Sequence, residues 1–192
     1  MSPDVWVMVW PAEAFRELAQ SGGSGIRLAL RRPLRMLVVL GAVGSLATSG
    51  RISLRLGAAC AESALFLPLL AIVSVLLARG RKISLARAVD LFFMGYGPWT
   101  LWLIALAAEW AFLPPQRAYE LLAYRRIWYF AALLVFLWSL IIDFWYLRRV
   151  CSRTPFQAVG WLAMQRLIVW TAGLGIFLGA SGWQVVASRF GP

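Results

Sequence analysis

The sequence predicts an all-α protein: a polytopic membrane helical bundle of about five transmembrane helices with an N-terminal interfacial amphipathic helix. Three observations predict this class. First, 61% of the 192 residues are hydrophobic, more than is usual in a soluble domain. Second, the apolar residues gather in runs close to the length of about 20 residues that crosses a bilayer. Third, the 19 basic residues fall in short clusters beside these runs, a pattern that orients membrane proteins.

The prediction divides the chain into an N-terminal unit, residues 1–25, and a five-span transmembrane domain, residues 26–192. Pro11 suits the first turn of a helix that runs to about residue 20. This helix mixes apolar residues such as Phe15 with charged ones. It is too short and too charged to span, so we expect it to lie along the headgroup region. The Gly/Ser-rich residues that follow form a hinge.

Five apolar runs are the expected spans: residues 36–50, 57–78, 91–108, 127–147 and 167–187. The first is short for a span, and the stem of Arg35 extends it by reaching toward the interface. The second carries Pro68 inside it. The last is rich in small residues, and Gly175-x-x-x-Gly179 lets another helix approach closely.

The third span is the centre of the prediction, because Gly95-Tyr96-Gly97-Pro98 interrupts the apolar stretch 88–114 about one third of the way along. Proline removes a backbone donor, and the two glycines let the backbone bend. We therefore expect a broken helix in the middle of the bundle. The alternative is an ordinary kink that serves packing alone, since glycine and proline are common in membrane helices.

Four acidic residues in or beside the spans are candidate functional residues, because charge at membrane depth is costly. Glu62 and Glu109 lie toward the expected outer face, and Asp90 and Asp143 lie toward the inner face. On the inner side, Asp90 follows Arg87 by three residues on one helix face, and Asp143 lies about one and a half turns from Arg148. Pairing with these arginines is one interpretation, and a proton or ion path is the other.

The two outer acids, Glu62 and Glu109, are expected to meet Arg125 or Arg126 across the outer surface. None of the four acids lies clearly at the bilayer midplane, where a transport carboxylate is most informative. Pairing for orientation and packing is therefore the preferred interpretation of all four.

Composition argues against several functional classes. Histidine is absent, and Cys60 and Cys151 are expected at opposite faces of the membrane, so we expect no metal site and no disulfide. No nucleophile elbow or phosphate loop occurs, so we expect no enzyme and no cofactor. The net charge of +11 belongs to the clusters beside the spans, so no nucleic-acid partner is expected. Most aromatic residues are interpreted as interface anchors.

The distribution of basic residues predicts the orientation. Thirteen of the 19 basic residues fall on the side of the N-terminus and six on the other side. Loops rich in arginine and lysine stay in the cytoplasm. We therefore expect a cytoplasmic N-terminus and, with an odd number of spans, a C-terminus outside.

Several short motifs resemble the YIP (Ypt-interacting protein) domain family of five-span membrane proteins, bacterial type. They are Pro11-x-x-x-Phe15-x-x-Leu18, Gly80 with Ile83-Ser84-Leu85-Ala86-Arg87-Ala88 ahead of Tyr96-Gly97-Pro98, Leu137-Trp138-Ser139-Leu140, Leu147-Arg148-Arg149, and Thr154-Pro155-Phe156-Gln157-Ala158. The resemblance implies a helical bundle in the bacterial cytoplasmic (inner) membrane with its N-terminus inside. Eukaryotic relatives associate with small Rab-type GTPases through a long N-terminal region that has no counterpart here.

The preferred hypothesis is a non-enzymatic scaffold or accessory subunit that acts through helix–helix contacts in the lipid bilayer. Its expected partner is another membrane protein or a second copy of the chain. A small transporter or lipid-handling protein, with a cavity at the broken third span, is the alternative. A third hypothesis is an interfacial role in which the N-terminal helix and the basic inner loops hold anionic lipid or a soluble partner.

Overall fold

The computed structural model describes residues 1–21, 26–49, 51–80, 83–112 and 122–190, and every regular element in these ranges is an α-helix. In chain order the helices are α1 (Pro3–Val9), α2 (Pro11–Gln20), α3 (Ile26–Ser49), α4 (Leu54–Ser63), α5 (Phe66–Ala78), α6 (Leu85–Met94), α7 (Gly97–Phe112), α9 (Leu122–Arg149) and α10 (Pro155–Phe190). The all-α prediction is confirmed for these ranges.

Local sequence signals explain where several helices begin. The Ser84 hydroxyl accepts a hydrogen bond from the Arg87 amide at 3.3 Å and so caps α6. At the start of α10, the Gln157 amide donates to the Thr154 hydroxyl, and the Thr154 amide donates to the Gln157 side chain. This reciprocal pair is a capping box, and Pro155 occupies the first helical position, where a proline costs no hydrogen bond.

The expected second span consists of two helices, because the chain turns between α4 and α5. Pro68 lies in the first turn of α5 and has no amide hydrogen to donate to the carbonyl of Ala64, four residues earlier. The Leu67 amide bonds that carbonyl instead, at 3.1 Å. Proline therefore places the break just before itself, in contrast to the single continuous helix that the apolar run 57–78 predicts.

Two stretches in the described ranges are long and apolar enough to cross a membrane: Leu54–Ala78 and Arg126–Arg149. A third is the pair Leu85–Met94 and Gly97–Glu109, which is bent by 46° at its break. These stretches correspond to the second, fourth and third expected spans. The first expected span lies in α3, whose N-terminal third is occupied by arginines, and the last lies in α10, where most side chains lie outside the described residues. The count of five spans is therefore not confirmed.

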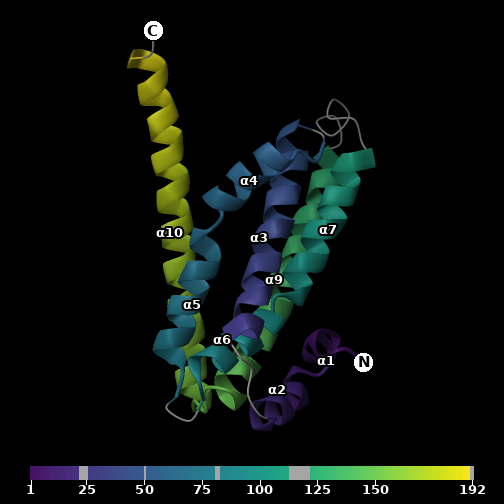
Figure 1. Ribbon diagram of the computed structural model, residues 1–192, viewed down its shortest axis with the longest axis vertical. Coiled ribbons are helices and arrows are strands. Elements are labelled where there is room, and N and C mark those ends of the chain that lie inside the picture. The colour runs from purple at the N-terminus through teal and green to yellow at the C-terminus, as the bar shows by residue number, and fades with distance from the viewer. Residues whose placement is uncertain (22–25, 50, 81–82, 113–121, 191–192) are drawn as a thin grey trace.

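The helices pack as an elongated bundle (Figure 1). Helices α3, α7 and α9 run side by side, α4 packs against α3, and α10 contacts α5 and α9. The short helices α1 and α2 lie at the end of the bundle where α9 stops and α10 begins, and α10 extends along the long axis toward the other end (Figure 1). The buried core cluster joins residues of α1 and α2 to residues of α6 and α9.

The N-terminal segment packs on protein through its apolar side. Phe15 of α2 is fully buried, and its ring meets that of Tyr146 of α9 edge to face, with 5.7 Å between centroids. Val7 of α1 is also fully buried and belongs to the same core cluster as Leu91 and Ile142. Part of the apolar side of this segment is therefore covered by protein, while Val5, Val9 and Trp10 stay exposed, and its expected place along the headgroup region stays a prediction. Helices α6 and α9 offer α2 an aromatic surface that the local sequence does not reveal.

Candidate functional site

The predicted break lies between α6 and α7 and is tightly packed. A side-chain carbon at Gly95 would lie 2.8 Å from Cγ2 of Ile142 on α9, and one at Gly97 would clash with the Met8 side chain of α1. Pro98 is fully buried. The two glycines therefore let one helix from each side approach the bend, and the break serves as a contact point for α1 and α9.

Tyr96, the remaining residue of the break, joins an aromatic cluster. Its ring stacks on Phe93 at 5.2 Å between centroids and meets Phe92 edge to face at 5.6 Å. Phe92 in turn contacts Tyr146, whose hydroxyl donates a 3.0 Å hydrogen bond to the Ala88 carbonyl. Rings in such edge and stacked arrangements contribute beyond their buried area, so this cluster fixes α6 against α9.

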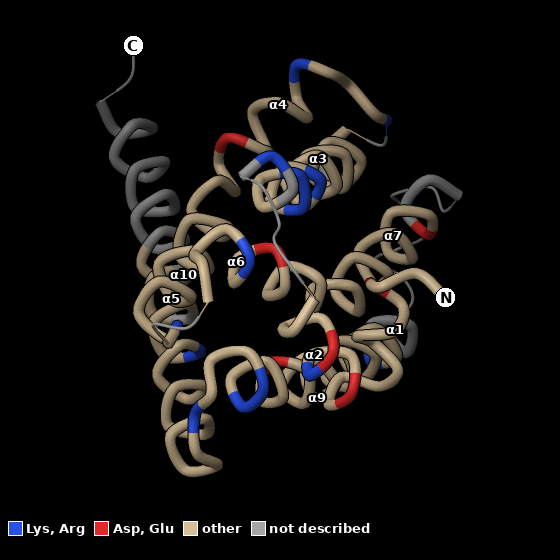
Figure 2. The backbone as a smooth tube through the Cα atoms, turned by 60° about the horizontal axis from the view of Figure 1, so that its bottom comes forward, with Lys and Arg blue, Asp and Glu red and all other residues tan. Residues whose placement is uncertain are grey.

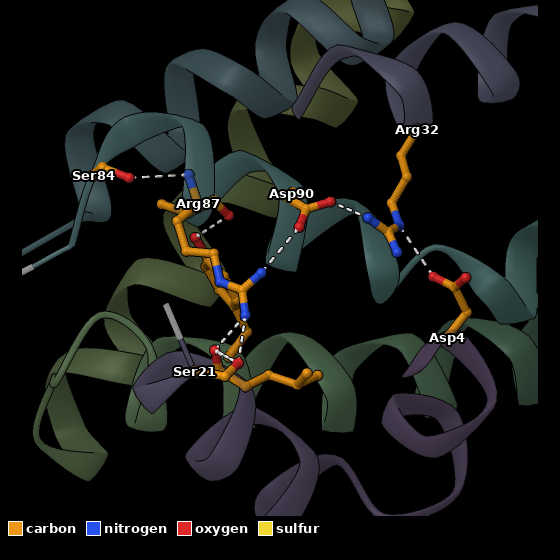
Figure 3. Close-up of polar contacts among 9 residues, drawn as sticks. Asp4, Ser21, Arg32, Ser84, Arg87 and Asp90 are labelled. Carbon is orange, nitrogen blue, oxygen red and sulfur yellow. Dashed lines mark hydrogen bonds and ion pairs between the residues drawn. The ribbon is translucent and has the colours of Figure 1, made fainter. Parts of the chain in front are cut away.

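Asp90 lies at the centre of a buried ionic network that joins four helices (Figure 3). It is 2% exposed, and Arg87 of the same helix donates to it at 3.3 Å, as the spacing predicted. Arg32 of α3 donates to its other oxygen and also to Asp4 of α1, the latter at 3.0 Å. Two aspartates and two arginines therefore compensate one another in charge.

Arg87 extends this network to the end of α2. One of its terminal nitrogens donates to the Leu18 carbonyl at 2.5 Å and to the Ser21 hydroxyl at 2.9 Å (Figure 3). The Leu18 carbonyl lies in the last turn of α2, where a helix leaves carbonyls without an intrahelical partner, and it also accepts from the Ser21 hydroxyl at 3.0 Å. The network thus attaches the N-terminal helices to α3 and α6. The pair of Arg87 and Asp90 was predicted from the spacing, but the contacts between helices were not.

Asp143 pairs with a different arginine from the one expected. It is 5% exposed, and the partner is Arg166 of α10, with 2.5 Å between Nη2 and Oδ2. The same guanidinium donates to the Ser139 hydroxyl at 3.2 Å. The predicted pairing with Arg148 is wrong, because five residues on a helix turn the two side chains about 140° apart. Arg148 donates instead to the Arg153 carbonyl at 2.8 Å.

The outer acids show no such network. Glu62 of α4 is exposed and Glu109 of α7 is half-buried. Neither enters an ion pair with another residue whose side chain the structure describes. Arg126 is exposed, and the side chain of Arg125 lies outside the described part, so the proposed outer pairing with Arg125 stays a prediction.

Close helix packing through small residues occurs at a position that the sequence reading missed. A side-chain carbon at Gly41 of α3 would lie 2.5 Å from the Gly57 carbonyl oxygen of α4, and one at Gly44 would meet Cys60 at 2.8 Å. The three-residue spacing of small residues on both helices was the available signal. At Gly175 a side-chain carbon would meet nothing within 4 Å, and the surroundings of Gly179 lie outside the described side chains.

The described part of the chain holds no group of three His, Cys, Asp or Glu residues able to bind a metal ion. Its cleft lies between α5, α6, α9 and α10 and is lined in part by Phe92, Tyr146, Trp161 and Gln165. Directly beside the two glycines of the break, Ile142 and Met8 occupy the space, and the proposed cavity at the broken span stays a prediction.

Comparison of the chain with protein-family models, with curated proteins and with solved structures gives no match. The resemblance to the YIP domain family stays a prediction.

Proposed function

We propose that the chain is an integral membrane protein that acts as a scaffold or accessory subunit, through contacts with other membrane helices. The observation that carries this proposal is the use of its two buried aspartates. Each is bound by an arginine from another helix, Asp90 by Arg32 and Asp143 by Arg166. Charges paired in this way at membrane depth connect helices. Their use for pairing favours a role in the assembly of helices over a catalytic role.

The exposed faces of the apolar helices support the membrane placement. Large apolar side chains are exposed along α5 and α9, among them Leu69, Val73, Phe130, Leu134 and Ile141. A soluble monomer rarely exposes contiguous apolar patches beyond a few hundred Å². Lipid, a second copy of the chain or a partner helix would cover these faces. The basic clusters favour a cytoplasmic N-terminus, and the resemblance to the bacterial YIP-type proteins favours the inner membrane.

Native co-purification tests this proposal. The tagged chain is extracted in a mild detergent after brief in-cell crosslinking, and the complex is weighed by native mass spectrometry. We expect a stoichiometric membrane-protein partner or a homo-oligomer. A chain recovered as a lone monomer, with and without crosslinking, would refute the scaffold role.

The cleft between α5 and α10 favours a second candidate, a small transporter or lipid-handling protein. In that case Asp143→Asn abolishes ion- or proton-coupled flux in proteoliposomes while the helical content stays unchanged. Under the scaffold proposal, wild-type protein and Asp143→Asn give the same background flux. Flux measured with both proteins therefore separates the two candidates.

A further inference from the structure

The cleft between α5, α9 and α10 has an apolar wall and opens on the flank of the bundle. About 360 Å³ of non-atom space lies in and around it, and much of this space is open to the surroundings, so the cleft is shallow. Leu77 of α5 and Met164 and Ile168 of α10 line it, and all three are exposed on the surface. An apolar group can therefore lie along this cleft from outside the bundle.

An arginine lies at one end of this cleft. The Arg153 guanidinium donates to the Ala78 carbonyl from Nε at 3.2 Å and from Nη2 at 3.1 Å. It also lies over the Trp161 ring, 5.6 Å from its centroid. Ala78 and Trp161 both line the cleft, so a cation is held where the apolar wall ends.

The basic residues at this end have no acidic partner among the ion pairs of the described residues. Arg79 follows Ala78 directly, and Arg148 donates to the Arg153 carbonyl. None of these three arginines forms an ion pair in the part of the chain that the structure describes. The sequence has no Asp or Glu in 63–89 or 144–192. Figure 2, which brings this end forward, shows basic positions where α9 passes into α10.

We propose that this cleft binds an anionic phospholipid. The phosphate lies against Arg148 and Arg153, with Arg79 nearby, and one acyl chain lies between α5 and α10. Guanidinium groups suit phosphate oxygens because their donors form a planar fork. The three cations stand in contrast to Arg32, Arg87 and Arg166, which aspartates neutralise. The site rests on the membrane location of the proposed function, and it is independent of any protein partner.

Native mass spectrometry of the detergent-purified protein tests the site, with dioleoylphosphatidylglycerol and dioleoylphosphatidylcholine titrated separately. We expect the wild-type protein to bind the anionic lipid at least about fivefold more tightly, since one basic residue near a charged headgroup is worth roughly that factor. Arg153→Gln keeps an amide donor for the Ala78 carbonyl and should remove most of this preference. Ser74→Leu, which fills the cleft wall, should weaken both lipids and preserve their ratio.

Arg16→Gln is the matched control, because Arg16 is an exposed basic residue of α2 that does not line the cleft. Equal affinity of the wild-type protein for the two lipids overturns the proposal. So does an equal effect of Arg153→Gln and Arg16→Gln. Glycerol phosphate, the headgroup chemistry without acyl chains, should not displace the lipid at millimolar concentration, and displacement refutes the acyl-chain contact.

Two further outcomes are decided in advance. If the Arg153→Gln protein loses its helical circular dichroism, the proposal is tested by two other measurements: the ratio of the wild-type affinities for the two lipids and the lipid titration of Ser74→Leu. A lone monomer in the co-purification refutes the scaffold role, and it leaves the expected lipid preference unchanged.

Discussion

The pair of Asp143 and Arg166 offers the sharpest test of how α9 and α10 are joined. Arg166→Met keeps an unbranched apolar stem and removes every donor, so the carboxylate, 5% exposed, loses the guanidinium at 2.5 Å. Breaking a buried ion pair by removing one partner costs about 3 kcal/mol or more. The expected loss in the free energy of unfolding is therefore about 3 kcal/mol, which is more than a hundredfold in the equilibrium constant.

The assay is reversible unfolding in mixed micelles with increasing dodecyl sulfate, followed by far-UV circular dichroism. Arg149→Met is the matched control, because Arg149 is exposed and its guanidinium lies 5.3 Å from the centroid of the Trp145 ring. A contact of this kind at an exposed site is worth about 0.5–1 kcal/mol. The reasoning fails if Arg166→Met shifts stability no more than Arg149→Met does.

A double variant separates the pair from its surroundings. Replacing both partners, as Asp143→Leu with Arg166→Met, leaves no buried charge, so stability should return to within about 1 kcal/mol of the wild-type protein. A coupling energy of at least about 2 kcal/mol between the two substitutions is expected, since the cost of Asp143→Leu alone adds to it. Additive effects would mean that Asp143 does not depend on Arg166 for its charge compensation.

Three further predictions concern packing, reactivity and topology. Gly95→Ala should destabilise the protein, since the new methyl group would lie 2.8 Å from Ile142. Gly175→Ala, in open space, should be neutral or stabilising by up to about 1 kcal/mol. Equal effects of the two substitutions in the same unfolding assay would contradict the packing role of Gly95. In a Cys60→Ala background, Cys151 should resist maleimide at pH 8 until dodecyl sulfate unfolds the protein. Burial raises the pKa of its thiol to about 11, so roughly one molecule in a thousand is reactive thiolate at this pH. Rapid labelling of the native protein would show that the thiol is accessible. With five spans and a cytoplasmic N-terminus, a C-terminal alkaline phosphatase fusion should be active and a C-terminal green fluorescent protein fusion dark. The reverse pattern would require an even number of crossings or an N-terminus outside.

Local sequence information was enough for the features that depend on near neighbours in the chain. The helical class followed from apolar runs, and the break between α6 and α7 followed from two glycines and a proline within four residues. The Arg87 to Asp90 pair followed from three-residue spacing on one helix. Each depends on backbone geometry that repeats within one or two turns, so the sequence alone contains it.

Only the tertiary structure decided which distant groups meet. Arg32 is 58 residues from Asp90, and Arg166 is 23 residues from Asp143, so no helical period relates them. The same holds for the burial of Phe15 against Tyr146, which turned an expected lipid contact into a protein contact. Apolar side chains are attracted equally by lipid and by other helices. Shape and charge complementarity between helices made that choice, and both exist only once the chain is packed.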